Sequence, residues 1–321
     1  MHWRTALRAG SVWLLAGVSL ALCTATALGF VGRYWWVLDL ASHFRVQYFW
    51  LFAATCAASF ALRRWRWGLV NLCGLAVNGS LVLPLMLAPR PAVASDGQPL
   101  RVVAFNVWHT NRQFERVCAF IRETDADVAV FTEVSRKWGK ALHALDDTYP
   151  YSRELPIGSF GVAVYSKIPF DEFEFRMLSD GCPMACAQLR VGDARLALWG
   201  VHAFSPPSGE LTAYRNQQLQ LLGDLAGECK QPLVVIGDLN TTSWSWIFPD
   251  LLRRSHLRDS RWGFGVQPSW DGGLPWPLVP IDHCLVSDGV SVVNRQIGPF
   301  VGSDHRPLIV DLRIPRSAPS P

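Results

Sequence analysis

The sequence contains no internal repeat and no low-complexity segment, so neither a repeat architecture nor a biased-composition tail has to be considered. Its C-terminal two thirds also lacks an excess of positive charge. Residues 1–98 hold 8 Lys+Arg against 2 Asp+Glu, and residues 99–321 hold the remaining 22 and 24, a net charge of −2. Such a part lacks the electrostatic footprint of a nucleic-acid-binding protein. Nucleic acid is therefore not expected as a partner.

The cysteines lack a spacing that would be diagnostic of a metal site or a disulfide framework. Three of the 8 cysteines, Cys23, Cys56 and Cys73, lie in apolar runs and are expected to act as small apolar residues. Cys182 and Cys186 can pair if they lie in an oxidising compartment. Two free thiols are the alternative, and the sequence favours neither.

Three apolar runs near the N-terminus predict a membrane anchor. They are Ser11–Val31, Val46–Leu62 and Gly68–Ala88, with 21, 17 and 21 residues, and roughly 20 apolar residues cross a bilayer as a helix. The alternative for the first run is a cleaved signal peptide, but its length and the two following runs argue against that. We expect residues 1–90 to form an anchor of three transmembrane helices in the lipid bilayer, and residues 91–99 to form a linker.

The arginines beside these runs predict the orientation. Arg4 and Arg8 precede the first run, and Arg63, Arg64 and Arg66 fill the loop between the second and the third. Because basic loops stay in the cytoplasm, the N-terminus is expected inside and everything after the third run outside. The expected location is the cell membrane, multi-pass, with the C-terminal domain extracytoplasmic.

Strands and helices follow one another from Leu100 to the end of the chain, which predicts an α/β layered domain. Helices are expected at about Arg112–Glu123 and Leu211–Glu228. Strands are expected at Arg101–Val107, Asp127–Val134, Gly161–Lys167, Ala187–Val191, Arg195–Phe204, Val234–Ile236, Asp282–Ser287, Val290–Ile297 and Arg306–Arg313.

The stretch Val-Val-Ile-Gly-Asp-Leu-Asn, residues 234–240, predicts the centre of a functional site. Its three apolar residues indicate a strand buried on both faces, and Asp238 follows where this strand should surface. A buried carboxylate needs donors, a metal ion or water. Asn240 stands two residues further on, so an extended backbone would point both polar groups to the same side. Such a pair suits the positioning of a water molecule against a phosphorus centre.

Five further stretches carry polar residues at the ends of apolar runs. Singly, each has an ordinary explanation as a turn residue, a helix cap or a hydrogen-bonded histidine. Six such stretches in one chain favour a common site. The five place Asn106 in Ala-Phe-Asn-Val, Glu133 in Phe-Thr-Glu-Val, His202 in Leu-Trp-Gly-Val-His, Asp282 in Ile-Asp-His-Cys-Leu-Val, and Asp304 with His305 in Gly-Ser-Asp-His-Arg-Pro.

In this order, the six motifs resemble the endonuclease/exonuclease/phosphatase superfamily. The resemblance covers residues 100–316, the expected catalytic domain, and rests on Gly-Asp-Leu-Asn and Ser-Asp-His-Arg-Pro together with the upstream Asn and Glu. It implies an α/β fold, a four-layer α/β/β/α sandwich, preceded here by three transmembrane helices. Those helices make the chain similar to the membrane-anchored, VanJ-like bacterial branch. One departure is Thr132, where many members have Gln.

The resemblance also implies a metal site. Glu133 would be the principal ligand of a Mg²⁺ or Mn²⁺ ion, with Asn106 and Asp304 close to the same ion. Oxygen ligands of this kind suit Mg²⁺ or Mn²⁺ and not zinc.

The remaining motif residues would carry the chemistry, an in-line attack of water on phosphorus. His305, oriented by Asp282, would contact the phosphoryl group or move a proton. Asp238 would orient or deprotonate the water, Asn240 would hold it or a phosphate oxygen, and His202 would donate to the developing charge. Members of the superfamily differ over which residue is the base, and the sequence leaves that choice open.

An aromatic-rich segment follows Gly-Asp-Leu-Asn. It has two interpretations: ordinary core packing, or a loop that lies against the membrane or an acyl chain. Trp244 and Trp246 are therefore candidate substrate-binding residues, together with Arg215, which can hold phosphate oxygens. The aromatic residues of the segment are Trp244, Trp246, Phe248, Trp262, Phe264, Trp270 and Trp276.

The expected function is that of a membrane-anchored, Mg²⁺-dependent phosphohydrolase acting on a lipid-linked phosphate or pyrophosphate at the outer face of the cytoplasmic membrane. Lipid-linked phosphates are at hand there, whereas nucleotides are scarce. The alternative is a metal-dependent extracytoplasmic nuclease or phosphodiesterase. A catalytically inactive binding module is disfavoured because all the motif residues are present.

Overall fold

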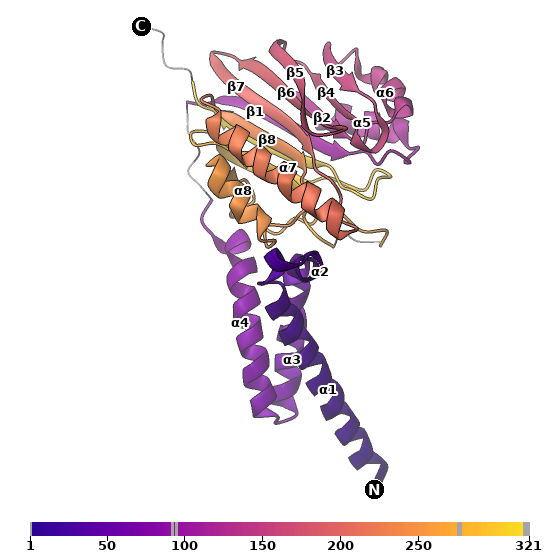
Figure 1. Cartoon of the computed structure of the whole chain (residues 1–321), viewed down its shortest axis with the longest axis vertical. Helices are drawn as coiled ribbons and strands as arrows, with labels where there is room; N and C mark the ends of the chain where they lie inside the picture. The colour runs from indigo at the N-terminus through magenta and orange to yellow at the C-terminus, as the bar shows by residue number, and fades with distance from the viewer. Residues whose placement is uncertain (1, 91–92, 94–95, 275–277, 317–321) are drawn as a thin grey trace. The chain divides into compact units, whose positions relative to one another are not determined.

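The structure, a computed structural model, describes residues 2–90, 93, 96–274 and 278–316. Trp276 of the aromatic segment lies outside the described residues. Internal contacts divide the chain into two compact units (Figure 1). The helical unit comprises Met1–Ala88 and Ser243–Trp246, and the sandwich unit comprises Pro89–Thr242 and Ile247–Pro321. The helical unit is therefore discontinuous in sequence.

The helical unit is built from three longer helices and one short one. They are α1 (His2–Leu28), α2 (Trp36–Leu40), α3 (Arg45–Ala61) and α4 (Trp65–Leu87), with the one-turn helices η1 (Gly32–Tyr34) and η2 (Ala41–Phe44) beside α2. Helices α3 and α4 pack closely at Gly74 of α4, since a Cβ there would lie 2.3 Å from the ring of Phe52 of α3. A polar bond joins α4 to α1, where Asn78 Nδ2 donates to Thr26 Oγ1 at 3.1 Å.

Among the described residues, α4 is the one helix that is long and apolar enough to cross a membrane, and Val12–Leu28 of α1 is a shorter apolar stretch. This criterion rests on length and composition alone. An anchor of three spans and its orientation therefore stay predictions.

The segment Ser243–Trp246 contacts the helices of its own unit. The Trp244 indole donates from Nε1 to the backbone carbonyl of Leu81 at 3.1 Å. The Ser245 hydroxyl lies 2.8 and 2.9 Å from the two carboxylate oxygens of the buried Asp39. Both contacts make this segment part of the helical unit's own packing.

The sandwich unit holds, in its described residues, two six-stranded mixed sheets. The first has the order β11-β12-β1-β2-β4-β3 and consists of β1 (Gln98–Asn106), β2 (Val128–Thr132), β3 (Tyr151–Leu155), β4 (Val162–Ser166), β11 (Ser291–Ile297) and β12 (Leu308–Ile314). The second has the order β5-β6-β7-β8-β10-β9 and consists of β5 (Phe170–Ser179), β6 (Cys182–Val191), β7 (Ala194–His202), β8 (Leu233–Asp238), β9 (Arg258–Asp259) and β10 (Asp282–Val286).

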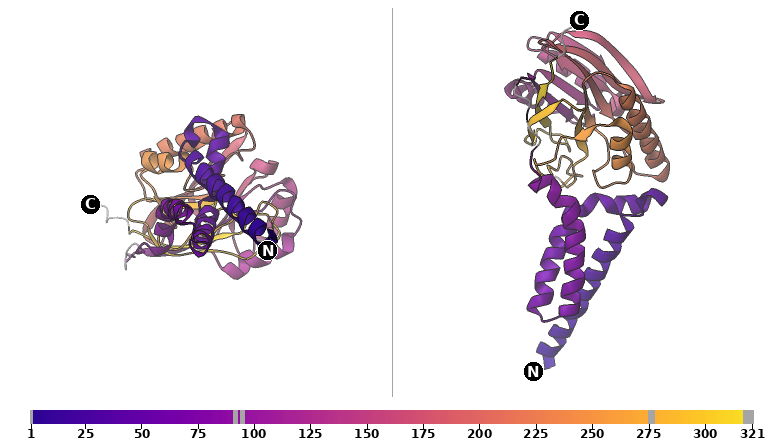
Figure 2. Two further views of the ribbon diagram at one scale, coloured as in Figure 1. Left: turned by 90° about the horizontal axis from the view of Figure 1, so that it is seen from below. Right: turned by 90° about the vertical axis from the view of Figure 1, so that its left-hand side faces the viewer.

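Helices cover the outer faces of both sheets (Figures 1 and 2). Helices α5 (Phe114–Thr124) and α6 (Arg136–Leu142) pack on the first sheet, and α7 (Gly209–Glu228) and α8 (Ile247–Ser255) lie against the second. The one-turn helices η3 (His143–Leu145) and η4 (Gly158–Phe160) flank β3. The predicted α/β sandwich of two sheets between helices is therefore confirmed. The sequence did not predict β3, β5, β9 or α8.

The main core lies between the two sheets. Alternate residues point into it from both sides, among them Val102 and Val130 from the first sheet and Leu198 and Ile236 from the second. The sheets approach closely where Gly200 faces Val130, since a Cβ at that glycine would lie 2.6 Å from the valine Cγ1. The intervening residues of the first sheet point to its other face and form a second core under α5 and α6, around the fully buried Trp138.

Cys182 and Cys186 are both free and buried in β6. Four residues along a strand span roughly 13 Å, whereas the Cα atoms of a disulfide lie within about 7 Å of each other. The pairing that the sequence left open is therefore excluded in this fold.

Candidate active site

Strand register brings the polar strand ends to one edge of the second sheet. Strands β7 and β8 run parallel, with His202 beside Asp238, and β10 runs antiparallel to β8, with Asp282 on the other side of Asp238. Strands β7 and β8 therefore end at the same edge at which β10 begins. The three side chains that the sequence placed in separate motifs become direct neighbours.

The first sheet contributes the remaining residues in the same way. Asn106 ends β1 beside the last residue of the parallel strand β2, and Glu133 follows immediately. Asp304 and His305 precede β12, which runs antiparallel to β1 and therefore begins at the edge where β1 ends. Asn106 Nδ2 donates to Asp238 Oδ2 at 3.0 Å, which joins the two sheets across the site.

The turn after β8 positions Asp238 and Asn240. Gly237 has φ 140°, and a Cβ there would lie 2.1 Å from the carbonyl oxygen of Val201, so only glycine fits. Asp238 Oδ1 accepts from the backbone N–H of Asn240 at 2.8 Å. Asn240 Nδ2 lies 3.4 Å from Asp238 Oδ2 and donates to the Ala203 carbonyl at 2.9 Å.

The two polar groups therefore lie side by side as predicted, but the backbone reason was wrong. Asn240 has φ 48°, a left-handed conformation, so the chain turns after Asp238 and does not continue as an extended strand. Asparagine tolerates this conformation because its short amide bonds to the local backbone.

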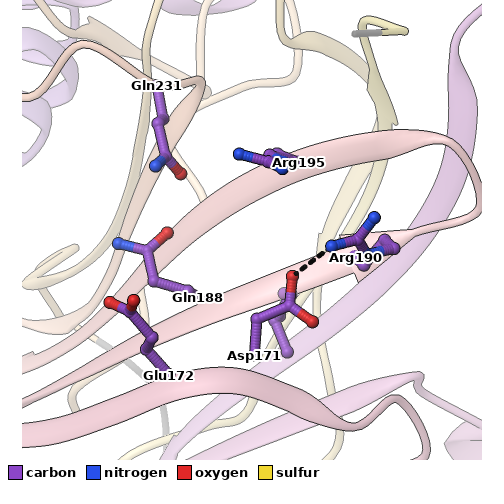
Figure 3. A pocket seen from close by; sticks show the side chains of 7 residues that line it. Asp171, Glu172, Gln188, Arg190, Arg195 and Gln231 are labelled. Carbon is purple, nitrogen blue, oxygen red and sulfur yellow. Dashed lines mark hydrogen bonds and ion pairs between the residues drawn. The ribbon is translucent and has the colours of Figure 1, made fainter.

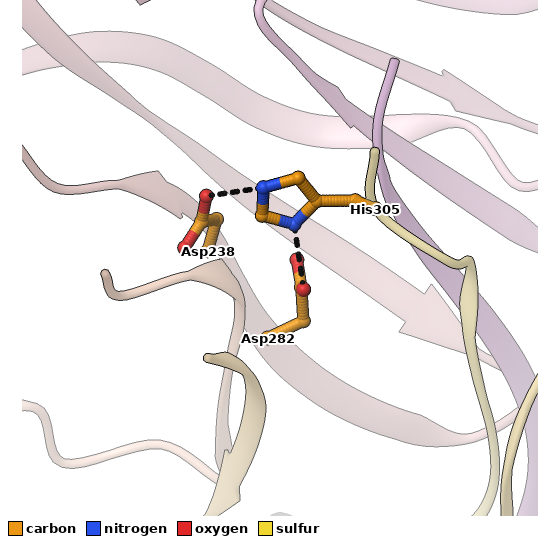
Figure 4. A group of neighbouring side chains, drawn as sticks. All are labelled: Asp238, Asp282 and His305. Carbon is orange, nitrogen blue, oxygen red and sulfur yellow. Dashed lines mark hydrogen bonds and ion pairs between the residues drawn. The ribbon is translucent and has the colours of Figure 1, made fainter. Parts of the chain in front are cut away.

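His305 is held between two carboxylates (Figure 4). Its Nδ1 lies 2.8 Å from Asp282 Oδ2, and its Nε2 lies 3.5 Å from Asp238 Oδ2. All three side chains are buried. Burial alone would lower the pKa of His305, but the charges of Asp282 and Asp238 and the hydrogen bond to Asp282 outweigh it and raise the pKa to about 10. The His305 ring is therefore an imidazolium at neutral pH, oriented by Asp282.

Asp238 has the properties of a proton acceptor. Burial raises its pKa to about 7, a shift that the charge of His305 opposes and the charge of Asp282 supports. A carboxyl that titrates near neutral pH can take a proton from water and release it again. His202 Nε2 lies 3.7 Å from the same carboxylate. Burial lowers the pKa of His202 to about 4, so this ring is neutral at pH 7.

Glu133 and Asp304 are partly exposed and form, with the buried Asn106, the other half of the site. Asn106 Nδ2 donates to Glu133 Oε1 at 3.1 Å, and Trp270 Nε1 donates to Asp304 Oδ2 at 3.1 Å. Burial, followed by the nearby charge of Glu133, raises the pKa of Asp304, although His305 and Trp270 oppose the shift. Within the described residues, neither Glu133 nor Asp304 forms an ion pair with Lys or Arg.

Two neighbouring carboxylates without a Lys or Arg partner fit a divalent cation, since they supply oxygen ligands and negative charge. Asp238, Asp282 and His305 could also hold an ion by their spacing, because their ligand atoms lie within 4.8 Å of one another. In that group, however, both ring nitrogens of His305 face carboxylates and carry protons. Glu133, Asn106 and Asp304 could therefore hold the cation.

Arg215 has a different position from the one expected. It is fully buried in α7, and its Nη1 donates to the backbone carbonyl of Asn240 at 2.8 Å. Its Nε and Nη2 lie 3.0 and 2.9 Å from Asn216 Oδ1. The structure thus gives Arg215 a supporting contact behind the Asn240 turn in place of the predicted contact with substrate. The other two candidates, Trp244 and Trp246, belong to the helical unit.

Three residues at the site escaped the sequence analysis. Ser303 donates to the Asn106 carbonyl at 2.7 Å and accepts from the His305 backbone N–H at 3.1 Å. Trp270 contacts Asp304, and His109 contacts Glu133 through Nδ1 at 2.7 Å. Ser303 stood within a recognised motif and could have been found. Trp270 was named in the aromatic segment without a contact to Asp304, and nothing in the local pattern marks His109.

A separate hollow of about 350 Å³ lies at the other end of the second sheet (Figure 3). Arg195 near the start of β7 and Gln231 just before β8 line it, so it faces away from the ends of these strands that carry His202 and Asp238. Its Arg190 pairs with Asp171 at 3.2 Å. None of the motif residues lines this hollow, so it does not belong to the candidate active site.

Comparison with solved structures identifies the same fold in other proteins. One similar chain is an endonuclease/exonuclease/phosphatase from Beutenbergia cavernae, with 22% identity and a TM-score of 0.56 over 68% of this chain and 72% of that one. A humanised D. rerio TDP2 has 15% identity and a TM-score of 0.56 over 67% and 99%. Sphingomyelinase C from Streptomyces griseocarneus has 21% identity and a TM-score of 0.51 over 66% and 99%. These identities establish the fold alone.

The sequence itself matches no curated protein. It does match the model of the Endonuclease/Exonuclease/phosphatase family over residues 103–305, a range that contains every motif residue from Asn106 to His305. The chain therefore belongs to the endonuclease/exonuclease/phosphatase family and is a metal-dependent hydrolase of phosphoric esters or anhydrides.

Proposed function

We propose that this enzyme uses Mg²⁺ or Mn²⁺ to hydrolyse a lipid-linked phosphate or pyrophosphate, and that three helices anchor it with the sandwich unit outside the cytoplasmic membrane. The chemistry rests on the site at the sheet edge, where a carboxyl that titrates near neutral pH lies beside an imidazolium. The substrate class rests on an aromatic surface beside that site.

The protonation state of each residue at the site decides its proposed role in the reaction. The ion held by Glu133, Asn106 and Asp304 would neutralise charge on the phosphoryl group. Asp238, whose pKa is raised to about 7, takes the proton of the attacking water.

Two further groups orient the reactants. Asn240, held beside Asp238 by the turn, keeps the water in place. His305 is kept positive by Asp282 and Asp238, and its Nε2, which lies 3.5 Å from Asp238 Oδ2, donates to a phosphoryl oxygen as the charge on that oxygen grows.

Three aromatic rings extend from His202 to the protein surface. The Phe160 ring lies 6.1 Å from the His202 ring and 4.7 Å from Phe204, and Phe204 lies 6.1 Å from Tyr214. Tyr214 is 43% exposed. A row of rings next to a phosphoryl site can bury the apolar part of a substrate, at roughly 25 cal/mol per Å². The name of the similar sphingomyelinase C also points to a lipid.

The charge of the sandwich unit supports the same choice over a nuclease. Duplex DNA binding depends on Lys and Arg that neutralise phosphates, and residues 99–321 carry more acidic than basic side chains, 24 against 22. Arg215, the basic residue expected at the site, is buried and bonded to the backbone.

The test uses the full-length protein in lipid nanodiscs with Mg²⁺, assayed in parallel against a polyprenyl pyrophosphate, sphingomyelin, plasmid DNA and the water-soluble headgroup analogue. We expect much faster hydrolysis of a lipid-linked phosphate than of the soluble analogue. Tyr214→Ala should raise KM for the lipid several-fold and leave the soluble analogue unchanged.

Tyr151→Ala is the matched control, because Tyr151 is similarly exposed, at 39%. It starts β3 at the level of Val128, at the end of the first sheet away from Glu133. The substitution should change neither KM. Rapid cleavage of plasmid DNA without lipid hydrolysis would replace this proposal with the nuclease alternative. Equal losses on both substrates in Tyr214→Ala would show that the aromatic row is structural.

A further inference from the structure

The loop after β1 brings a third histidine, His109, to the site. Its backbone N–H and its ring Nδ1 both contact one oxygen of Glu133, Oε2, at 3.2 and 2.7 Å. The other oxygen, Oε1, accepts from Asn106 at 3.1 Å. Both oxygens of the carboxylate are therefore held from fixed directions. A freely rotating glutamate would lose this orientation.

The loop is itself held in place, so the position of His109 is determined by the fold. Trp108 has φ 57°, an uncommon conformation for a bulky residue. Its N–H donates to Asn106 Oδ1 at 3.0 Å, and its carbonyl accepts from Asn111 N at 2.8 Å and from Trp138 Nε1 at 3.2 Å. This left-handed turn reverses the chain and directs both His109 donors toward Glu133.

His109 has no packing role that would explain this arrangement. Its side chain is 41% exposed, whereas that of Glu133 is 16% exposed, so the imidazole lies on the solvent side of the carboxylate. Glu133 also has a left-handed backbone, with φ 58°. Strained non-glycine residues of this kind concentrate at functional sites.

We propose that His109 is a positioning residue of the metal site, which orients Glu133 by donating a hydrogen bond from Nδ1 to Oε2. This inference rests on the proposed role of Glu133 as the principal metal ligand. Residues that orient a metal ligand contribute roughly 10- to 100-fold to metal affinity. Removal of the imidazole should therefore weaken Mn²⁺ binding by such a factor without abolishing it, since the backbone donor remains.

The experiment measures Mn²⁺ binding to the full-length protein in detergent by electron paramagnetic resonance of the free ion. His109→Ala should raise the Mn²⁺ Kd roughly 10- to 100-fold. His109→Asn should restore most of the affinity, because the amide nitrogen of Asn occupies nearly the place of Nδ1 and donates the same bond. Arg112→Ala is the loop control, because Arg112 is exposed and contacts the backbone carbonyl of His109, at 3.4 Å, and not its ring. It should leave Kd unchanged.

The variant Glu133→Gln tests the role of Glu133 as a metal ligand separately from the role of His109. If Glu133→Gln binds Mn²⁺ as tightly as the native protein, the metal site itself is wrongly placed. If Glu133→Gln loses the ion but His109→Ala keeps it, only the role of His109 is refuted. A nitrogen nucleus coupled directly to bound Mn²⁺, lost in both His109 variants, would also refute a positioning role, because His109 would then be a ligand.

Discussion

His283 gives the sandwich unit a specific sensitivity to acid. The residue lies on β10, next to Asp282 of the candidate site, and is fully buried. Nε2 lies 2.7 Å from the Thr241 carbonyl, and Nδ1 lies 3.3 Å from Arg261 Nη2. Because a guanidinium only donates, Nδ1 must be the acceptor and Nε2 must carry the proton. A second proton would have to be placed on Nδ1, facing a positive charge.

Burial, with the charge of Arg261 added and that of Asp259 opposing, lowers the pKa of His283 from 6.5 to about 3. Between pH 6.5 and about pH 3, His283 therefore binds a proton in the unfolded chain but not in the folded protein. The stability present above that pH is lost as the pH falls, at up to about 1.4 kcal/mol per pH unit. Between pH 6.5 and about pH 4.5 the loss from this one group is about 2 kcal/mol.

The assay compares thermal unfolding midpoints of the native protein and His283→Gln in one detergent, at one scan rate. A Gln amide can donate to the Thr241 carbonyl and accept from Arg261 but does not titrate. The midpoint of the native protein should fall by about 4–8 °C more than that of the variant over this pH range, since 1 kcal/mol corresponds to roughly 2–4 °C in a domain of this size. Parallel falls in the two proteins would refute the assignment of the acid sensitivity to His283.

Three shorter predictions concern the site, the fold and the anchor. Glu133→Gln and Asp238→Asn should each lower turnover by roughly two orders of magnitude or more while the metal-free unfolding midpoint barely changes; near-normal activity in either would contradict its assigned role. Gly237→Ala places a Cβ 2.1 Å from the Val201 carbonyl, so calorimetry should show a large fall in the midpoint, and an unchanged midpoint would contradict the strain argument. A phosphatase reporter that needs export should be active when fused after Arg90, and a fluorescent protein that needs the cytosol should be dark there; the reverse pattern would place the sandwich unit inside.

The sequence predicted the elements whose signal is local. Strand β8 is buried along its whole length, and its apolar run and glycine marked both the strand and the turn that follows it. Strand β5 escaped because it lies at a sheet edge and carries Asp171, Glu172 and Glu174 among its apolar residues. Helix α8 escaped because Pro249 in its first turn resembles a loop signal, although proline is well tolerated at that position.

The motif residues were predictable because the ends of parallel strands and the starts of their antiparallel neighbours meet at one edge, whatever the loops do between them. The direction of a long side chain is not local in this sense. Arg215 points into the Asn240 turn because a backbone carbonyl 25 residues away accepts from it. His109 depends on a left-handed Trp108, a conformation that no sequence rule assigns to a tryptophan. Contacts of these two kinds require the assembled fold.

The discontinuity of the helical unit has a practical consequence for protein engineering. A gene cut after Ala88 does not separate the two units, because Ser243–Trp246 would remain in the catalytic fragment without Asp39 and Leu81. That fragment would expose two indoles and a hydroxyl just beyond the turn that carries Asn240, and such a surface favours aggregation. A soluble version of the enzyme therefore needs a second edit, in which a short polar turn joins Thr242 to Ile247.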